Sequence, residues 1–309
     1  MTMYDLAIIG GGPAGTAAGV YASRKHLKTL FVTKEWGGQS TVSPSIENWI
    51  GSATISGNEL ADDLKGHLEH YAGEQVTILG GKHVKTIKKA DEGYMIVLED
   101  DTEHHTKAVL ISSGSTRRHL KAMGADEFEH KGLTYCASCD GPLFAGQDVA
   151  VIGGGNAGFE TAAQLLAYAK SVTLIHRGPA FKADPVTVEK VLAHPNMTGI
   201  LNANTLAVTG EKFVNGLTYQ DVTDNSEKTL PVTGIFVEIG MLPNTDLAKE
   251  VVALDEYNRI EIDPWTQKTS AENIWAAGDC TNVKYHQNNI SAGDGVKALE
   301  DIYITLKAK

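Results

Sequence analysis

The chain has 309 residues, of which 42% are apolar and 21% charged, the composition of a globular protein with one large domain or two ordinary ones. Its net charge of −11 favours neither nucleic acid nor an anionic membrane surface as a partner. Three cysteines are too few for a secreted disulfide framework, and neither a leader-like start nor a bilayer-length apolar run is present, so we expect a reducing, cytoplasmic setting.

A glycine-rich turn between a strand and a helix is the first motif. Residues 5–10 form a short apolar run, and residues 16–25 are alanine-rich and compatible with a helix. Gly10, Gly12 and Gly15 match the G-x-G-x-x-G fingerprint, whose glycines allow a tight turn, approach of a pyrophosphate and close packing of helix on strand. Because the helix N-terminus offers free N–H groups to phosphate, we predict a dinucleotide site here.

The next strand, residues 29–33, ends where an acid normally accepts hydrogen bonds from the adenosine ribose. Thr33 occupies that position, so Glu35, two residues later, is our candidate for the ribose contact. Beyond it, periodicity predicts a helix over 57–71 and strands over 75–87, 94–98 and 108–111.

A pair of cysteines, Cys136 and Cys139, is followed at once by Asp140. One helical turn brings residues three apart within the Cα distance that a disulfide needs, and Gly141-Pro142 would end such a turn. The motif alone fits a redox dithiol, half of a zinc site or an incidental pair. In a reducing compartment a C-x-x-C is more often catalytic than structural.

The strand–glycine–helix pattern then recurs. Residues 148–152 form an apolar strand, Gly153, Gly155 and Gly158 repeat the fingerprint, and residues 161–169 are again alanine-rich. Two complete fingerprints in one chain predict two dinucleotides, typically a flavin and a nicotinamide.

The strand after the second fingerprint, residues 171–175, ends in His176-Arg177 rather than in an acid. An acid there would hold a free 2′-hydroxyl, whereas a cation accommodates the 2′-phosphate of NADP. Arg177, with Lys182 further on, therefore favours NADPH; alternatively, both cations simply face solvent.

The last third of the chain continues the alternation. We expect strands within 201–219 and 230–239, then an exit loop over 240–245. Asp279, which follows an apolar strand and Gly278, is placed to accept a hydrogen bond from the ribityl chain of a flavin. A C-terminal helix is expected from about residue 285 to residue 306.

These motifs, in the order GGGPAG, GGQ, ENW, YCxxCDGP, GGGNxG and AAGDC, resemble those of the low-molecular-weight thioredoxin reductases along essentially the whole chain. In detail, CDGPLF, GGGNAGFE, PAFKAD and GIFVEIGMLPNT are similar to the C-terminal reductase part of the alkyl hydroperoxide reductase flavoprotein. That protein has an added tandem thioredoxin-fold segment; this chain begins at the FAD strand, so we expect no built-in thioredoxin-like acceptor.

The resemblance implies an α/β fold of two dinucleotide-binding, Rossmann-like three-layer domains. The FAD domain would comprise residues 1–115 and 245–309, and the NAD(P)H domain, residues 116–244, would be inserted into it and carry the C-x-x-C. Crossings near 115–116 and 241–243 would be hinges for a domain rotation. A homodimer is also implied.

The family's functional positions can be carried over motif by motif. Those for FAD are Gly10, Gly12, Pro13, Ala14, Gly15, Glu35, Gly38, Gln39, Asn48, Gly278, Asp279, His286, Gln287 and Asn288. Those for the nicotinamide nucleotide are Gly153, Gly155, Asn156, Ala157, Gly158, His176, Arg177 and Lys182. No metal is implied.

Three departures from the family pattern affect these expectations. Gly178 and Lys182 replace two of the arginines that thioredoxin reductases use for NADPH. The hydroperoxide-reductase relatives use NADH and place an acid where His176 stands, so NADH remains possible beside NADPH. His286-Gln287 replaces Arg-Gln near the flavin, and Ser113-Gly114 replaces Thr-Gly before the crossing.

By this resemblance, NAD(P)H reduces FAD, the flavin reduces the Cys136–Cys139 disulfide, and the dithiol reduces thioredoxin or a thioredoxin- or glutaredoxin-like protein. Cys139 would face the flavin, Cys136 would attack the partner, and Asp140 would move the proton. Two alternatives stay open. One is a reductase of ferredoxin, a flavin or a quinone, or a disulfide reductase that uses a ferredoxin or a flavin as its donor. The other is a non-enzymatic redox sensor or zinc-stapled protein. Cys280 is expected to be buried and inert.

Overall fold

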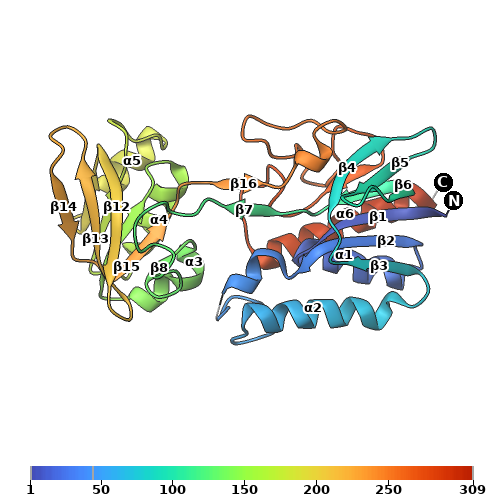
Figure 1. The fold of residues 1–309 in the computed structure, drawn as a ribbon, viewed down its shortest axis with the longest axis horizontal. Coiled ribbons are helices and arrows are strands. Elements are labelled where there is room, and N and C mark those ends of the chain that lie inside the picture. Colours follow the sequence, from blue (N-terminus) through green and yellow to red (C-terminus); the bar gives the residue numbers. More distant parts are fainter. Residues whose placement is uncertain (1, 44, 308–309) are drawn as a thin grey trace. The chain divides into compact units, whose positions relative to one another are not determined.

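The structure, a computed structural model, describes residues 2–43 and 45–307. The chain divides into two compact units (Figure 1): unit 1 is Met1–Thr116 with Leu242–Lys309, and unit 2 is Arg117–Met241. Each unit is built on a sheet whose central strands are parallel: the sheet of unit 2 is wholly parallel, whereas that of unit 1 also contains two antiparallel strands. The predicted α/β class with two Rossmann-like domains is confirmed.

Unit 1 contains a seven-stranded sheet in the order β3-β2-β1-β6-β5-β4, with β17 paired to β6. The strands β1, β2, β3, β6 and β17 run parallel, and β4 and β5 are antiparallel. The strands are β1 (Met3–Gly11), β2 (Thr29–Trp36), β3 (Val76–Gly80), β4 (Val84–Lys89), β5 (Tyr94–Leu98), β6 (Glu103–Ile111) and β17 (Ile274–Ala276). The helices are α1 (Pro13–Arg24), α2 (Gly57–Ala72) and α6 (Asn288–Lys307), with short turns η1 (Gly38–Val42) and η3 (Asp246–Ala248).

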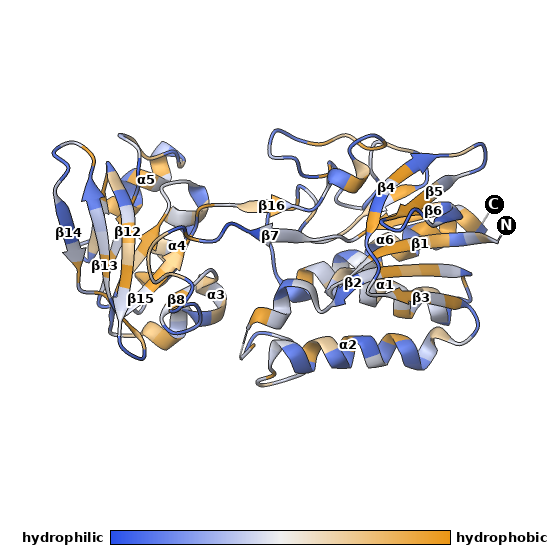
Figure 2. Cartoon of the chain, in the orientation of Figure 1, coloured by the Kyte–Doolittle hydropathy of each residue, from blue (hydrophilic) through white to orange (hydrophobic). Residues whose placement is uncertain are grey.

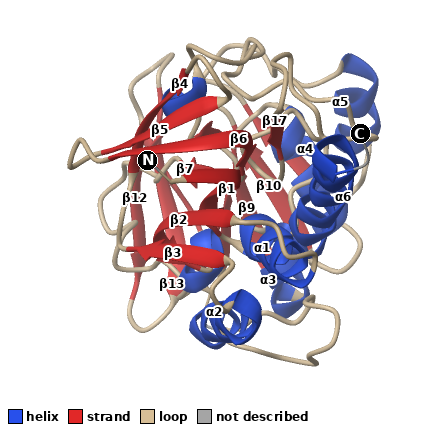
Figure 3. Cartoon of the chain, turned by 90° about the vertical axis from the view of Figure 1, so that its right-hand side faces the viewer, coloured by secondary structure: helices blue, strands red, loops and turns tan. Residues whose placement is uncertain are grey.

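Alternation along the central strands supplies both faces of the unit 1 core. On β1, Leu6 and Ile8 pack under α1, α2 and α6, whereas Ala7 and Ile9 pack against β4, β5 and η3. Because both faces are covered, the central strands each contain a run of buried apolar residues, which Figure 2 shows in orange. The three helices gather on one side of the sheet (Figure 3), with α1 against α6.

Unit 2 has a five-stranded parallel sheet in the order β11-β10-β9-β15-β8. Helices α4 and α5 cover one face, and a three-stranded antiparallel sheet covers the other. Its strands are β8 (Leu133–Thr134), β9 (Asp148–Ile152), β10 (Ser171–Ile175), β11 (Met197–Ile200), β12 (Ala203–Gly210), β13 (Val214–Asp221), β14 (Glu227–Leu230) and β15 (Gly234–Val237). Its helices are α3 (Ala137–Asp140), α4 (Asn156–Leu165) and α5 (Pro185–Leu192), with the turn η2 (Gly141–Phe144).

The chain crosses between the units twice, at β7 (Ser115–Arg117) and β16 (Met241–Pro243). These two segments pair in a small sheet of their own. Among the described residues, no helix is both long enough and apolar enough to cross a membrane.

Several predicted boundaries differ from the structure. The helices α1 and α4 begin at Pro13 and Asn156, directly after the fingerprint turns and before the predicted starts at residues 16 and 161, so the last glycine of each fingerprint lies inside the helix. The strand predicted over 75–87 is two strands, since Gly81 at φ +72° turns the chain between them. Helix α5 has no counterpart among the predicted elements.

Candidate functional site

Each fingerprint turn, together with the first turn of the helix that follows it, forms a backbone cradle. The first cradle is residues 10–15 in unit 1, and the second is residues 153–158 in unit 2. Gly10 and Gly153 have φ values of +118° and +132°, and a side chain on either would collide with the carbonyl oxygen of Ser112 or Glu238. Gly12 and Gly155 cap α1 and α4 without a side-chain hydrogen bond, so the first N–H groups of each helix point outward unpaired by a cap.

The space in front of each cradle is open. A Cβ atom on Gly12 or Gly155 would meet nothing within 4 Å. Outward N–H groups, a positive helix end and room for close approach together fit the pyrophosphate of a dinucleotide. In unit 1 Gly38 also lies beside Gly12, since a Cβ atom added to Gly38 would be 3.6 Å from the Gly12 Cα.

Polar side chains from both ends of the sequence meet at the rim of the unit 1 cradle. The Asn48 side-chain amide donates to Gln287 at 3.1 Å, and the Ser40 hydroxyl donates to Asn288 at 3.0 Å. Asn289, which the sequence did not single out, donates to the backbone oxygen of Asn48 at 2.7 Å. The start of α6 is thereby fixed against Ser40 and Asn48. Glu35 and Gln39 are exposed.

Asp279 follows β17 and lies beside the N-terminal part of α6. Its carboxylate accepts from Ser291 at 3.3 Å and lies 3.3 Å from Nδ1 of His286. Gly278, at φ +77°, lets the backbone turn against Ala14 and Ser291. The predicted flavin contacts Ala14, Gly278, Asp279 and His286 are therefore neighbours in unit 1.

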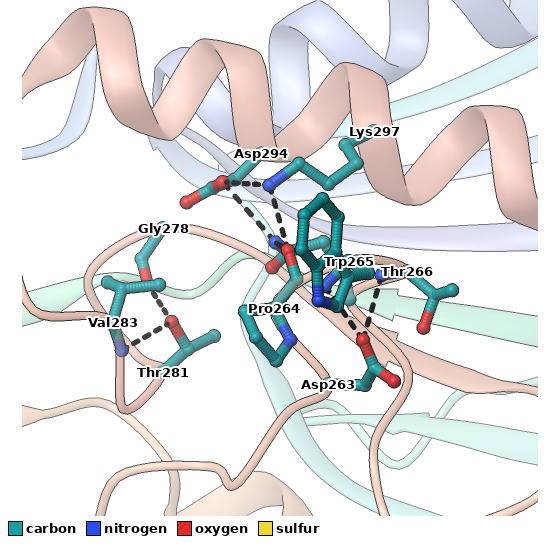
Figure 4. A network of polar contacts seen from close by, with 10 residues as sticks. Asp263, Pro264, Trp265, Thr266, Gly278, Thr281, Val283, Asp294 and Lys297 are labelled. Atoms are coloured by element: carbon teal, nitrogen blue, oxygen red, sulfur yellow. Dashed lines mark hydrogen bonds and ion pairs between the residues drawn. The ribbon is translucent and has the colours of Figure 1, made fainter.

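Figure 4 shows one polar contact within this turn and a second group of contacts around Asp294 of α6. The Thr281 hydroxyl donates to the Gly278 oxygen at 2.7 Å. From α6, Lys297 donates to the Pro264 oxygen at 3.0 Å and lies 3.4 Å from buried Asp294. Burial raises the pKa of Asp294.

In unit 2, His176 closes the base of the second cradle. Its Nδ1 accepts from the Gly154 N–H at 3.2 Å, which ties the end of β10 to the fingerprint turn. Burial, followed by Lys182 and Arg177, lowers the pKa of His176, so the imidazole is neutral and its Nε2 carries the proton. That Nε2 is buried without a hydrogen-bond partner among the described residues, and it offers a donor to a ligand.

The positive charge of this region comes from Arg177 and Lys182, which are not buried. The loop carrying them is bound to the cradle, since the Lys182 N–H donates to the Gly154 oxygen at 2.7 Å. Asn156, at the start of α4, accepts from the Asp184 N–H at 2.8 Å. Its side-chain oxygen therefore positions the loop and leaves its amide nitrogen for a ligand.

The cysteine pair forms a tight turn after β8. Cys136 and Cys139 are joined as a disulfide, with Cα atoms 5.3 Å apart. Cys136 caps α3, and its Sγ accepts from the Cys139 N–H at 3.2 Å. Such a donor would stabilise a thiolate at Cys136 after reduction. Gly141 follows because a side chain there would strike the hydroxyl of Tyr168.

Thr134 links the cysteine turn to Asp140. Its hydroxyl donates to the Asp140 carboxylate and accepts from the Cys136 N–H at 3.4 Å. Asp140 is thus held at the same turn as Cys136. The sequence motifs do not single out Thr134; the available signal is a hydroxyl residue two positions before the first cysteine.

The remaining cysteine and the potential metal ligands lie apart from this chemistry. Cys280 is fully buried beside Ile111, as expected, and burial raises the pKa of its thiol to about 11. Within the described residues, one group with metal-ligand spacing consists of His119, Asp126 and Glu129. It includes neither Cys136 nor Cys139, so it gives no support to a zinc site at the pair.

The chain is similar to known proteins along almost its whole length. Residues 4–295 match the family described as pyridine nucleotide-disulphide oxidoreductase. Among solved structures, the thioredoxin reductase from Giardia duodenalis has a TM-score of 0.94 at 30% identity, covering 100% of both chains. The thioredoxin reductase from Streptococcus pyogenes has a TM-score of 0.91 at 30% identity, covering 99% of both chains.

Curated relatives carry two kinds of name. A protein named NADH dehydrogenase from Bacillus subtilis is 38% identical over 295 residues, which covers 96% of this chain and 57% of the relative. The F subunit of alkyl hydroperoxide reductase from Staphylococcus epidermidis is also 38% identical, with the same coverage of 96% and 57%. The chain therefore spans little more than half the length of these relatives.

Proposed function

Because the chain belongs to the pyridine nucleotide-disulphide oxidoreductase family, we propose that it is a disulfide reductase that uses NAD(P)H, FAD and the Cys136–Cys139 pair. The observation that carries this proposal is the disulfide itself, held in a turn with Asp140 and Thr134 in the unit that contains the second cradle. When bound in unit 1, FAD would supply two kinds of chemistry: acceptance of a hydride and transfer of its two electrons to the disulfide.

The residues of the turn then perform the exchange. With two electrons and two protons taken up, the Cys136 thiolate attacks one sulfur of a partner disulfide, and the other partner sulfur leaves as a thiol. Cys139 attacks Cys136 in the resulting mixed disulfide, which restores the Cys136–Cys139 bond and releases the reduced partner. Asp140, fixed by Thr134, accepts the proton from one thiol and returns it to the leaving sulfur.

The acceptor that we propose is thioredoxin or a thioredoxin- or glutaredoxin-like protein. Support comes from the thioredoxin reductase structures that this chain resembles over its whole length. A carrier of a peroxidase system is the variant suggested by the relatives named as the F subunit of alkyl hydroperoxide reductase. NADPH is the proposed donor because Arg177 and Lys182 are cations at the end of β10; NADH is the alternative. We also propose a homodimer in a reducing, cytoplasmic setting.

A second candidate function follows from the relatives named NADH dehydrogenase. In that case electrons would leave directly from the flavin to a small acceptor such as a quinone, and the cysteine pair would be dispensable. A ferredoxin or flavin as electron donor or acceptor belongs to the same group of alternatives.

Replacing both cysteines separates these functions. We expect the Cys136→Ser/Cys139→Ser protein to keep its flavin but to lose NADPH- and NADH-dependent reduction of thioredoxin, measured with insulin as final acceptor. Cys280→Ala is the matched control, because that thiol is buried and outside the turn. Retained thioredoxin reduction in the double variant contradicts the proposal, and retained quinone reduction alone supports the second candidate.

A further inference from the structure

A partly buried glutamate next to the second cradle has no part in the chemistry described above. Glu238 directly follows β15, and its backbone oxygen lies against Gly153, the first glycine of the fingerprint. Its carboxylate accepts from the Thr161 hydroxyl of α4 at 2.7 Å. Burial raises the pKa of Glu238 to about 7, so the group changes charge within the physiological range.

The sheet order places Glu238 in the crevice where a ligand is expected. In the order β11-β10-β9-β15-β8, the chain proceeds from β9 toward β10 and β11, whereas β15 and β8 lie on the other side of β9. The switch point is therefore between β9 and β15, and ligands of such sheets bind at the carboxyl ends of the strands there. Glu238 stands at that point, at the carboxyl end of β15.

The direction of a bound nucleotide follows from the same order. The adenosine ribose goes to the end of β10, with His176 and Arg177, and the pyrophosphate goes to the start of α4. The nicotinamide half then continues past β9 to the β15 side. Glu238 is thus at the nicotinamide end of the cradle, whereas Arg177 and Lys182 are at the adenosine end.

The charge of the nicotinamide ring gives Glu238 a function there. The ring is positively charged in the oxidised nucleotide and neutral in the reduced one, so an ionised carboxylate attracts the first more than the second. We propose that Glu238 is a specificity-determining residue that sets the relative affinity of the enzyme for oxidised and reduced nicotinamide nucleotides as a function of pH. This inference rests on the nucleotide site of the proposed function.

Two charged side chains near Glu238 also affect its pKa. Glu160 on α4 repels a second negative charge, whereas Arg117 on β7 favours it. The hydrogen bond from Thr161 also favours the ionised form. Deprotonation of Glu238 should therefore tighten binding of the oxidised nucleotide as the pH rises through about 7, with little effect on the reduced form.

Equilibrium binding to the oxidised, flavin-loaded full chain tests this proposal. The probes are NADP⁺ or NAD⁺, the corresponding 1,4,5,6-tetrahydro nucleotides, whose neutral ring cannot transfer hydride, and 2′,5′-ADP or ADP, which lack nicotinamide. Between pH 6 and pH 8 we expect the preference for the oxidised over the tetrahydro nucleotide to rise by about threefold to tenfold. In Glu238→Gln that rise should be absent, and binding of the ADP fragments should match the wild type.

Two further variants make the outcome decisive. Thr161→Val removes a bond that favours ionisation, so it should move the pH midpoint upward, which a purely structural role of Glu238 would not do. Glu227→Gln, an exposed position on β14, is the matched control. An unchanged pH dependence in Glu238→Gln overturns the role of Glu238, whereas failure of the wild type to bind any nucleotide overturns the nicotinamide site itself.

Discussion

The side chain that organises the cysteine turn is Thr134. Its hydroxyl donates to the Asp140 carboxylate while its oxygen accepts from the Cys136 N–H, so one hydroxyl fixes both the proposed proton carrier and the cysteine proposed to attack the partner. If Asp140 moves the proton during exchange, its orientation depends on this bond. A carboxylate released from it would still be present but would be misplaced.

We therefore expect Thr134→Val to lower kcat for thioredoxin reduction by about tenfold, with KM for thioredoxin unchanged. Steady-state kinetics with thioredoxin as the varied substrate measure both parameters, and Thr229→Val on an exposed strand serves as the control. A change in KM alone would mean that Thr134 acts on partner binding instead.

Under the proposed function, we also expect the choice of nucleotide to depend on single residues. The pKa of His176 is lowered, so near neutral pH it contributes a donor and no charge, and Arg177 and Lys182 alone can pair with a 2′-phosphate. We expect Arg177→Ala/Lys182→Ala to raise KM for NADPH by about tenfold or more while changing KM for NADH by less than about twofold. Flavin reduction by each nucleotide measures this, with Lys190→Ala as control; equal effects on both would contradict the NADPH assignment.

At the scale of elements, packing of α4 on β9 depends on the third glycine of the fingerprint. A side chain on Gly158 would strike the backbone oxygen of Gly153, which the sheet holds in place. Gly155 has open space instead. Gly158 is therefore required for packing of α4, whereas Gly155 leaves room for a ligand to approach, although the two glycines lie within one helix turn.

Gly158→Ala should accordingly lower the unfolding midpoint of unit 2, because α4 must move away from β9. Gly155→Ala should leave that midpoint unchanged and weaken nucleotide binding, because its methyl group enters the space intended for phosphate. Thermal unfolding followed by circular dichroism, together with nucleotide titration, measures the two effects. Equal stability of the two variants would show that the helix can shift without loss.

The elements differ in how well the sequence predicts them. The pattern predicts β9 and β10 to the residue because these strands are short, rich in β-branched and apolar residues, and bounded by turns. It does not predict α5, although Asp184 caps this helix and Pro185 starts it, because its eight residues are too few for a helical period to stand out in the sequence. The C-x-x-C motif predicts the position of the cysteine turn. The proposed roles of Thr134 and Glu238 depend on their contacts with Asp140 and Thr161, and no sequence motif predicts these contacts.

At the scale of the whole molecule, stability should depend on pH through Glu238. Its folded-state pKa is about 7, above the ordinary value of 4.5, so folding favours the protonated form. Stability is then highest below about pH 4.5 for this group and declines as the pH rises toward 7, by up to about 3 kcal/mol. We expect Glu238→Gln to show a smaller fall in unfolding midpoint between pH 6 and pH 8 than the wild type. A parallel fall in both proteins would contradict the raised pKa.

The continuous course of unit 2 predicts that it can fold alone. Its two hydrophobic clusters, on either face of the β9 sheet, consist wholly of residues from 117 to 241, and its strands pair with one another. A fragment of residues 117–241 should therefore unfold cooperatively and give dispersed amide resonances. A fragment of residues 117–232 is the control: it lacks β15, which lies between β9 and β8 and carries buried Ile235 and Phe236. We expect that shorter fragment to remain unfolded, because the loss of a central strand exposes both faces of its neighbours. Lack of cooperative unfolding in the longer fragment would show that unit 2 depends on unit 1 for its stability.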